Sequence, residues 1–306
     1  MRMEFAKLNG LGNDFIIADD MSRDIELTEA EVQHLCDRHF GIGADGVILV
    51  RPADDGRALA YMHYINSDGT LAQMCGNGVR CFAKYLVDRG FANVSEGSLI
   101  ASTMAGERTI SFTVDADGKL EAATVDMGAP ILEPAQVPVA CEANATTPDG
   151  IPFVREAKLS SPWGDFAFTC VSMGNPHAIC FIDAWDELPD VLFRDPAHKS
   201  LDGLLLDGIG AAFESHPAFP EKTNVEFAEI TPDGIAMRVY ERGCGETLAC
   251  GTGACATFVA ACLTHRAQER GTVHLLGGDL HIEWDGTSSV FMTGPAEESF
   301  TGTIEV

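Results

Sequence analysis

The sequence predicts an α+β fold of two similar domains, each a mixed β-sheet around a central helix, with the functional site in the cleft between them. Short β-type segments far outnumber helical ones along the 306 residues, which disfavours alternating βαβ units. One order of features occurs twice: a Gly-Asn loop, strands, and a Cys-Gly-x-Gly turn that opens a helix. Such a repeat indicates two equivalent halves, and ligands bind preferentially where domains meet.

The predicted strands are apolar or alternating segments bounded by turns rich in glycine, proline, asparagine and aspartate. In chain order they are Met3–Lys7, Phe15–Ala18, Val47–Val50, Leu59–Ile65, Thr109–Val114, Ala122–Met127, Phe166–Val171, His177–Phe181, Thr223–Ile230, Ile235–Tyr240, Val273–Leu276, Leu280–Trp284 and Ser289–Thr293. Residues 297–306 are predicted to return to the first half as one more strand.

Three segments carry helical periodicity. The first begins with a capping-box pattern from Thr28 to Glu31. The second follows Cys75 and ends near Gly90, and the third follows Cys250 and ends before Gly271. Their apolar positions are Val32, Leu35 and Cys36 in the first, Val79, Phe82, Ala83 and Leu86 in the second, and Cys255, Phe258, Val259 and Cys262 in the third.

Clustered prolines at positions 130, 134 and 138 mark the expected join between the two halves. We therefore place residues 1–130 in a first half that contains Cys75. Residues 131–296 form a second half that contains Cys250, before the return strand at 297–306.

Composition excludes several classes of function. The chain carries 46 acidic and 20 basic side chains, a net charge of −26, whereas nucleic acids and anionic membranes are bound by basic patches. No signal sequence and no apolar run of about 20 residues is present, so a cytoplasmic location is expected. None of the ten cysteines forms a Cys-x-x-Cys pair, and no spacing indicates a metal site.

Two further patterns are better explained without function. Gly41 to Gly46 matches Gly-x-Gly-x-x-Gly, but it follows a helix and precedes a strand, the wrong context for a dinucleotide site. Cysteines inside apolar runs are predicted to be small buried hydrophobes; they are Cys36, Cys81, Cys180, Cys255 and Cys262.

The two Cys-Gly-x-Gly turns carry the chemistry. A helix N-terminus offers free N–H groups and a partial positive charge, so a cysteine there is expected to have a lowered pKa. The glycines let backbone amides approach a carboxylate. If Cys75 and Cys250 face one substrate, a thiolate can remove an α-proton from one face while a thiol delivers a proton to the other.

These motifs resemble diaminopimelate epimerase, an isomerase family that acts without pyridoxal phosphate on LL- and meso-diaminopimelate. The resemblance runs through most of the chain, in Lys-Leu-Asn-Gly-Leu-Gly-Asn-Asp-Phe (7–15), Tyr-Ile-Asn-Ser-Asp-Gly (64–69), Met-Cys-Gly-Asn-Gly-Val-Arg-Cys (74–81), Met-Gly-Asn-Pro-His (173–177), Thr-Asn-Val-Glu-Phe (223–227) and Tyr-Glu-Arg-Gly-Cys-Gly-Glu-Thr-Leu-Ala-Cys-Gly-Thr-Gly (240–253). It implies two similar domains, no cofactor, and a product that feeds lysine or cell-wall synthesis. A second copy of the chain is a possible partner.

The resemblance also implies roles for individual residues. Cys75 and Cys250 correspond to the catalytic pair, and His177 and Glu241 to residues that tune the thiols. Helix-end amides that hold the reacting carboxylate correspond to Gly76, Asn77, Gly251 and Thr252. Contacts with the non-reacting amino-acid head correspond to Asn13, Asn66, Asn175, Asn224, Glu241 and Arg242. Arg242 can fork onto a carboxylate and Glu241 can accept an ammonium group.

The chain departs from the family pattern at several places. Cys244 stands where the family usually has another small residue, and Gly46 stands where some members have a substrate-contacting glutamine, so that contact is not carried over. Residues 134–161 and 183–220 are longer or more irregular than the family core needs, as surface loops or interface segments are.

Two alternative functions remain open at this point. A proline or hydroxyproline racemase shares the superfamily, although that family has histidine where this chain has Asn77. A protein of another class could use Cys75 and Cys250 as a switch disulfide.

Overall fold

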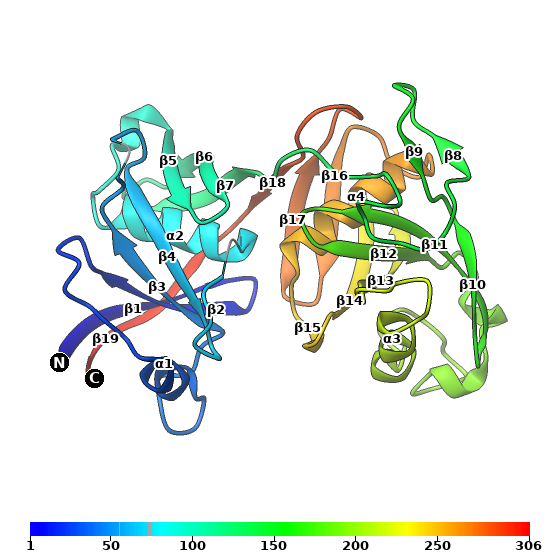
Figure 1. Ribbon diagram of the computed structural model, residues 1–306, viewed down its shortest axis with the longest axis horizontal. Coiled ribbons are helices and arrows are strands. Elements are labelled where there is room, and N and C mark those ends of the chain that lie inside the picture. The colour runs from blue at the N-terminus through cyan, green and yellow to red at the C-terminus, as the bar shows by residue number, and fades with distance from the viewer. Residues whose placement is uncertain (55, 73–74) are drawn as a thin grey trace. The chain divides into compact units, whose positions relative to one another are not determined.

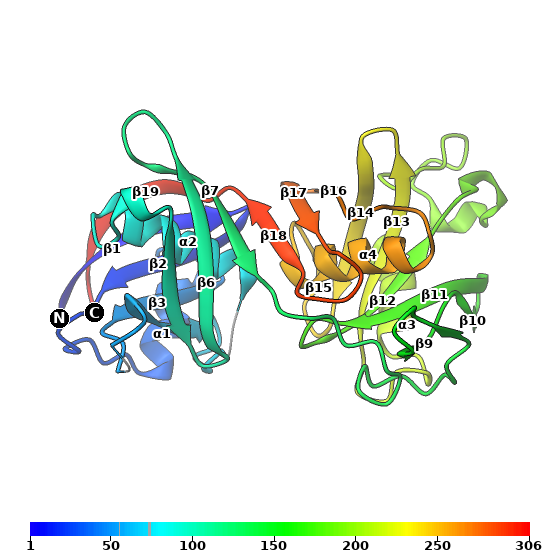
Figure 2. The same ribbon diagram turned by 90° about the horizontal axis from the view of Figure 1, so that it is seen from above.

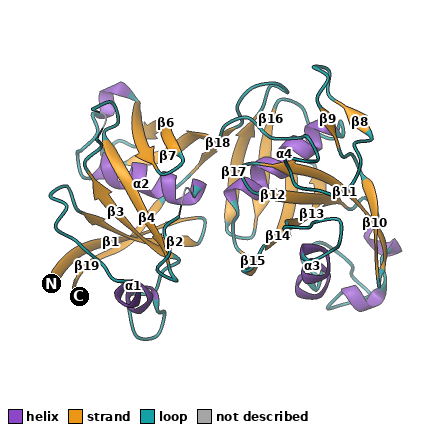
Figure 3. Ribbon diagram, viewed as in Figure 1, coloured by secondary structure: helices purple, strands orange, loops and turns teal. Residues whose placement is uncertain are grey.

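The computed structural model describes residues 1–54, 56–72 and 75–306, so Met74 of the first cysteine motif lies outside the described residues. The chain forms two compact units, one of residues Met1–Asp126 with Thr293–Val306 and one of Met127–Met292. The chain therefore changes unit after Asp126 and after Met292, whereas the sequence suggested residues 130 and 296. Strands dominate both units and helices are few (Figure 3), which confirms the predicted α+β class.

The first unit is a mixed sheet. Its strands pair in the order β19-β1-β2-β3-β4-β5-β6-β7, with β2–β3 and β4–β5 parallel and the other neighbours antiparallel. The strands are β1 (Arg2–Gly10), β2 (Asn13–Asp19), β3 (Gly46–Arg51), β4 (Ala60–Asn66), β5 (Ser98–Thr103), β6 (Gly106–Val114), β7 (Leu120–Asp126) and β19 (Glu297–Glu305).

One helix occupies the centre of this unit. Helix α2 (Gly76–Asp88) packs against β1, β2, β3 and β7 (Figure 1). Its predicted apolar stripe is fully buried, with Val79, Phe82 and Leu86 each 0% exposed. Helix α1 (Glu29–Cys36) starts with the predicted capping box, and a 3₁₀ turn, η1 (Val94–Glu96), follows α2.

The second unit repeats this topology. Strands β11, β12, β13, β14, β16 and β17 pair in the same antiparallel, parallel, antiparallel, parallel, antiparallel succession as β1 to β6. The predicted internal repeat is therefore confirmed at the level of topology. The strands after β7 are β8 (Ala145–Thr146), β9 (Pro152–Phe153), β10 (Ala157–Ser161), β11 (Gly164–Ser172), β12 (Pro176–Phe181), β13 (Asn224–Thr231), β14 (Gly234–Glu241), β15 (Gly245–Thr247), β16 (Arg270–Leu275), β17 (Gly278–Glu283) and β18 (Phe291–Gly294).

Helix α4 (Gly251–Leu263) takes the central place in the second unit. It contacts β11, β12, β13, β14, β16 and β17, and both ribbon views show strands around it (Figures 1 and 2). Because strands surround it, the helix is apolar on all sides rather than amphipathic. Across the described ranges, no helix has the length and apolar character needed to cross a membrane.

The two irregular stretches contribute to the core and are more than surface loops. Residues 183–220 contain two 3₁₀ turns, η2 (Trp185–Glu187) and η3 (Asp190–Leu192), and helix α3 (Leu206–Glu214). Helix α3 packs on β13 and β14 and buries Ile209 and Phe213 completely. Residues 134–161 hold β8, β9 and β10 and bury Val154 in the same core.

Helix α3 was missed because its signals are weak. Its N-cap, Leu205, makes no side-chain capping hydrogen bond, and glycines at 208 and 210 resemble helix breakers. A Cβ at position 210 would lie 2.5 Å from the Tyr240 ring. Glycine at position 210 therefore allows α3 to lie close to β14.

We expect Gly210→Ala to lower the free energy of unfolding by about 1–3 kcal/mol, because the new methyl group overpacks against Tyr240. Gly208→Ala is the matched control in the same helix. A Cβ at position 208 meets nothing within 4 Å, so that change should stabilise by about 0.5–1 kcal/mol. Urea unfolding of both variants checks the pair, and equal effects would contradict the packing argument.

Candidate functional site

Within each unit the predicted site residues lie at the same end of the strands. In the first unit, Asn13 starts β2, and Asn66 ends β4 opposite Gly46 at the start of the parallel strand β3. In the second unit, Asn224 starts β13 and Glu241 ends β14. The starts of two parallel strands and the end of an antiparallel neighbour lie at the same end of the sheet. The repeat therefore brings equivalent positions to equivalent places.

The catalytic candidates are the N-caps of the two central helices. Cys75 and Cys250 both have extended backbone, with φ of −140° and −121°, and neither uses its side chain to cap the helix. The first helical hydrogen bonds run from Val79 to Cys75 and from Ala254 to Cys250. The preceding N–H groups lie outside the helical ladder and can bind a carboxylate; they belong to Gly76, Asn77, Gly251 and Thr252 among the predicted residues.

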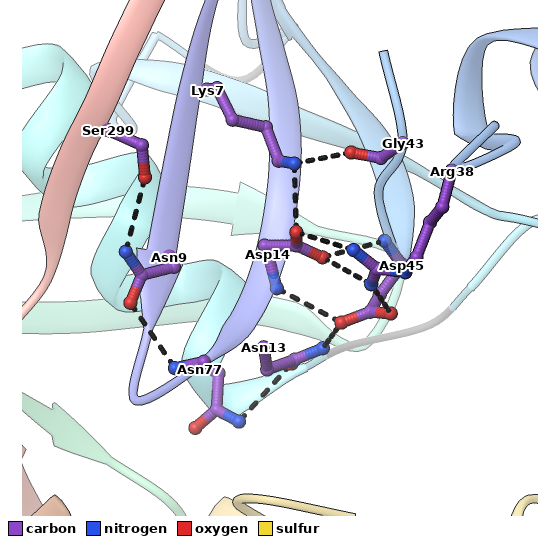
Figure 4. A network of polar contacts seen from close by, with 10 residues as sticks. Lys7, Asn9, Asn13, Asp14, Arg38, Gly43, Asp45, Asn77 and Ser299 are labelled. Atoms are coloured by element: carbon purple, nitrogen blue, oxygen red, sulfur yellow. Dashed lines mark hydrogen bonds and ion pairs between the residues drawn. The ribbon is translucent and has the colours of Figure 1, made fainter. Parts of the chain in front are cut away.

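Asn13 is held in a single orientation by its neighbours in the first unit (Figure 4). Its Nδ2 donates to Asp45 Oδ2 at 2.6 Å. Its Oδ1 accepts from Asn77 Nδ2 at 3.2 Å and from Cys75 Sγ at 3.5 Å. The carboxylate of Asp45 accepts only, so the amide carbonyl of Asn13 faces the thiol.

Two basic side chains, Arg38 and Lys7, hold the carboxylates that orient Asn13. Arg38 donates to Asp14 through both terminal nitrogens and to Asp45 at 2.7 Å. Lys7 pairs with Asp14 at 2.8 Å and donates to the Gly43 carbonyl (Figure 4). Burial alone would raise the pKa of Asp14, but Arg38 and Lys7 outweigh it and lower the pKa to about 2. Neither Asp45 nor its supports was predicted.

Asn66 and Asn77 have partners inside their own unit. Asn66 begins a turn in which its N–H bonds the Thr70 carbonyl and its Nδ2 donates to Thr70 Oγ1 at 3.1 Å. Asn77 is buried, and its Oδ1 accepts from Arg80 at 3.1 Å. Contact of these two side chains with a substrate stays a prediction.

Cys250 differs from the sequence-based expectation of a low pKa. Its side chain is buried, so desolvation raises the pKa of the thiol well above its usual value, and the charges of Glu241 and Glu226 raise it further. A hydrogen bond to Glu241 acts in the same direction, whereas Thr252 Oγ1, 3.5 Å from the sulfur, lowers it. Burial and the two carboxylates thus raise the pKa of Cys250, the opposite direction to the one that its place at a helix start predicts.

His177 is completely buried and both its nitrogens are engaged. Nδ1 lies 2.6 Å from Glu226 Oε1, and Nε2 lies 3.1 Å from Asn175 Oδ1. Its predicted role in tuning the thiols stays a prediction. Glu226 was missed, although a carboxylate between Val225 and Phe227 in a β-segment was a usable signal, because a buried acid usually has a specific partner.

Asn224 and Arg242 form a polar corner at the end of the sheet. Asn224 donates to the Pro176 carbonyl at 3.1 Å and accepts from the Arg242 backbone N–H at 2.8 Å. The Arg242 side chain is exposed and its Nη1 donates to the Glu221 carbonyl at 3.0 Å. Glu241 accepts from Thr247 Oγ1 at 2.5 Å. A guanidinium and a carboxylate thus stand on adjacent residues, as binding an amino-acid head requires.

The remaining cysteines mostly serve packing. Cys36, Cys81, Cys180 and Cys255 are buried, as predicted. The prediction was wrong for Cys262, which is half-buried because its thiol lies near the surface and donates to the Gln268 carbonyl at 3.0 Å. Cys244 is exposed. In the ranges that the structure describes, no three His, Cys, Asp or Glu side chains are grouped to hold a metal ion.

Proteins of a known family match this chain along nearly its whole length. The sequence model of the diaminopimelate epimerase family matches residues 5–133 and 169–298. A diaminopimelate epimerase of Desulfitobacterium hafniense is 44% identical over 306 residues, 99% of this chain and 98% of the relative. One from Leptospira biflexa is 40% identical over 100% of both chains.

Solved structures share the fold at low sequence identity. A hydroxyproline epimerase from Agrobacterium vitis superposes with a TM-score of 0.66 at 17% identity, covering 99% of this chain and 91% of that one. A phenazine biosynthesis protein from Bacillus anthracis gives a TM-score of 0.66 at 14% identity over 100% of both. With the fold and site described above, the match along both halves shows that this chain belongs to the diaminopimelate epimerase family.

Proposed function

We propose that this protein is an isomerase that interconverts LL- and meso-diaminopimelate by moving a proton at one α-carbon. One observation carries the proposal: Cys75 and Cys250 cap equivalent central helices in the two copies of a repeated fold. We infer that the two sulfurs address opposite faces of the same substrate carbon.

The proposed reaction uses one thiolate and one thiol. The raised pKa of Cys250 favours the state in which Cys250 is the thiol that delivers a proton and Cys75 is the base. The Cys75 thiolate takes the α-proton, the electron pair of the broken C–H bond stays on the α-carbon, and Cys250 protonates the opposite face. The cycle leaves Cys75 as thiol and Cys250 as thiolate, which is the state that catalyses the reverse reaction.

Backbone amides stabilise the charge that develops. The N–H groups at the starts of α2 and α4 bind the carboxylate next to the reacting carbon, where negative charge grows as the proton leaves. The residues proposed to supply them are Gly76, Asn77, Gly251 and Thr252. Proton transfer between the two sulfurs and the α-carbon does not require an electron sink such as pyridoxal phosphate, so we propose that no cofactor takes part.

The second amino-acid head of the substrate is proposed to bind at the polar corner of the second unit. Arg242 pairs with its carboxylate and Glu241 with its ammonium group. The asparagines at positions 13, 66, 175 and 224 complete the hydrogen bonds. A substrate with only one such head would leave Glu241 and Arg242 without their proposed charged partners, which costs affinity.

The racemase alternative is less well supported. Identity is 44% to a diaminopimelate epimerase but 17% to a hydroxyproline epimerase. Lysine biosynthesis in the cytoplasm is the proposed setting, and a homodimer stays a prediction. A switch disulfide between Cys75 and Cys250 would be a side reaction of the same two thiols.

Incubation of LL-diaminopimelate with the protein in D₂O tests the proposal. We expect α-deuterated meso product, detected by NMR and mass spectrometry, without added pyridoxal phosphate or metal. Turnover of proline in place of diaminopimelate would favour the racemase. Activity that depends on an added cofactor would overturn the two-thiol mechanism.

A further inference from the structure

His177 and Glu226 form a buried pair to which the reaction steps proposed above assign no role. Both side chains are 0% exposed. Burying a charged pair seldom adds stability compared with apolar residues of similar size. In addition, Glu226 Oε2 is buried without a hydrogen-bond partner among the described residues. A carboxylate buried at this cost calls for an explanation in what it does to its neighbours.

The position of one proton follows from the two contacts of His177. Its Nδ1 and Nε2 both face oxygen atoms, of Glu226 and Asn175. Because both nitrogens face oxygen atoms, one proton must lie between Nδ1 and Glu226, and burial, which raises the pKa of Glu226, acts in the same sense. Whether that proton sits on Nδ1 or on the Glu226 carboxyl group, Nε2 carries the other one and donates to Asn175 Oδ1.

This hydrogen bond determines which end of the Asn175 amide is available. With Oδ1 occupied by His177, the amide NH₂ group is left for a ligand, and the Asn175 side chain is partly exposed. Asn13 occupies the equivalent loop of the first unit but is held the opposite way, because Asp45 takes its NH₂ group. The two repeats thus present a carbonyl in one unit and an amide donor in the other.

We propose that Glu226 is a positioning residue that acts through His177 to hold Asn175 as a hydrogen-bond donor for a carboxylate oxygen of the substrate. Glu226 Oε1 lies 2.8 Å from where a Cβ at position 253 would stand. Glycine at the third position of α4 therefore lets the helix that carries Cys250 approach this carboxylate. The identity of the carboxylate ligand rests on the proposed function, whereas the hydrogen-bond chain from Glu226 to Asn175 does not.

The first test is spectroscopic and needs no substrate. In protein labelled with ¹⁵N-histidine, His177 should show a protonated Nε2 at neutral pH, with its signal identified by loss in His177→Gln. Glu226→Gln should lower the fraction of rings with a protonated Nε2, because an amide can face Nδ1 with either end and no longer dictates the tautomer. Glu229→Gln on the same strand is the matched control, since a glutamine oxygen can still accept from Trp185, which contacts Glu229 at 2.5 Å.

The second test measures substrate binding apart from chemistry. In a Cys75→Ala background, calorimetry should show that Glu226→Gln weakens diaminopimelate binding roughly tenfold, the scale of one charge-assisted hydrogen bond. Asn175→Ala should weaken it similarly. The two changes together should cost no more than Asn175→Ala alone, because Glu226 acts through Asn175. Glu226→Asp, which keeps the carboxylate, should retain the protonated Nε2 if Glu226→Gln does not fold.

The outcomes separate this inference from the proposed function. Additive effects of Glu226→Gln and Asn175→Ala, or an unprotonated Nε2 in the wild-type protein, would overturn the positioning role. Failure of the wild-type protein to bind or turn over diaminopimelate would overturn the proposed function, while the histidine spectrum would still decide the hydrogen-bond chain.

Discussion

Cys75→Ala and Cys250→Ala are each expected to reduce epimerisation by at least roughly 10³-fold, the scale of a lost general acid or base. Each proton transfer needs its own sulfur, because an alanine can neither remove the α-proton nor return one. The measurement is the rate of meso product formation from LL-diaminopimelate, together with deuterium incorporation at the α-carbon in D₂O.

The chain supplies matched controls for this prediction. Cys81 lies inside α2 and Cys255 inside α4, and both are 0% exposed. Cys81→Ala and Cys255→Ala remove the same atom from the same helices, so they should lower stability by about 1–2 kcal/mol through lost burial and leave turnover close to normal. Near-normal turnover in Cys75→Ala or Cys250→Ala would remove that residue from the acid–base role.

The repeat could be predicted because the sequence marks it locally. Asn-containing loops and Cys-Gly-x-Gly turns need particular backbone conformations, and both recur in order. Apolar periodicity then located α2 and α4, because each helix buries its stripe in the centre of its own unit. Helix α3 was not predicted because it depends on tertiary packing, in which Ile209 and Phe213 are buried and Gly210 lies close to Tyr240, and no local sequence pattern indicates such contacts.

The supports of the site were harder to predict because sheet register creates them. Asp45 reaches Asn13 only because β2 and β3 are parallel neighbours with Phe15 opposite Gly46. Glu226 reaches His177 because β12 and β13 run parallel with His177 opposite Asn224. The sequence motifs indicated the residues that are proposed to touch substrate. The residues that hold them in place are determined by strand pairing, which the motifs do not show.

Glu241→Gln is expected to change both substrate affinity and the acidity of Cys250. Loss of the carboxylate removes the proposed ammonium partner, so kcat/KM for diaminopimelate should fall roughly 10- to 100-fold, from one charged hydrogen bond. The same carboxylate raises the pKa of Cys250 through its charge and its hydrogen bond. Its removal should therefore lower that pKa, so the thiolate forms at lower pH.

Alkylation separates the second effect from the first. Iodoacetamide modification of Cys250, followed by peptide mass spectrometry across pH in the absence of substrate, should have its midpoint at lower pH in Glu241→Gln than in the wild type. Glu221→Gln is the control, because Glu221 contacts Arg242 through its backbone carbonyl only. An unchanged midpoint, or one at higher pH, would contradict the assigned influence of Glu241.

The direction of this shift in the pKa of Cys250 suggests a link between substrate binding and catalysis. An ammonium group bound at Glu241 offsets the same negative charge that Glu241→Gln deletes, so substrate binding should also lower the pKa of Cys250. A thiol that is weakly acidic in the empty site would then become a better proton donor when the distal head is in place. Alkylation cannot report this because substrate shields the sulfur, but a substrate lacking the distal amine should lose kcat as well as affinity.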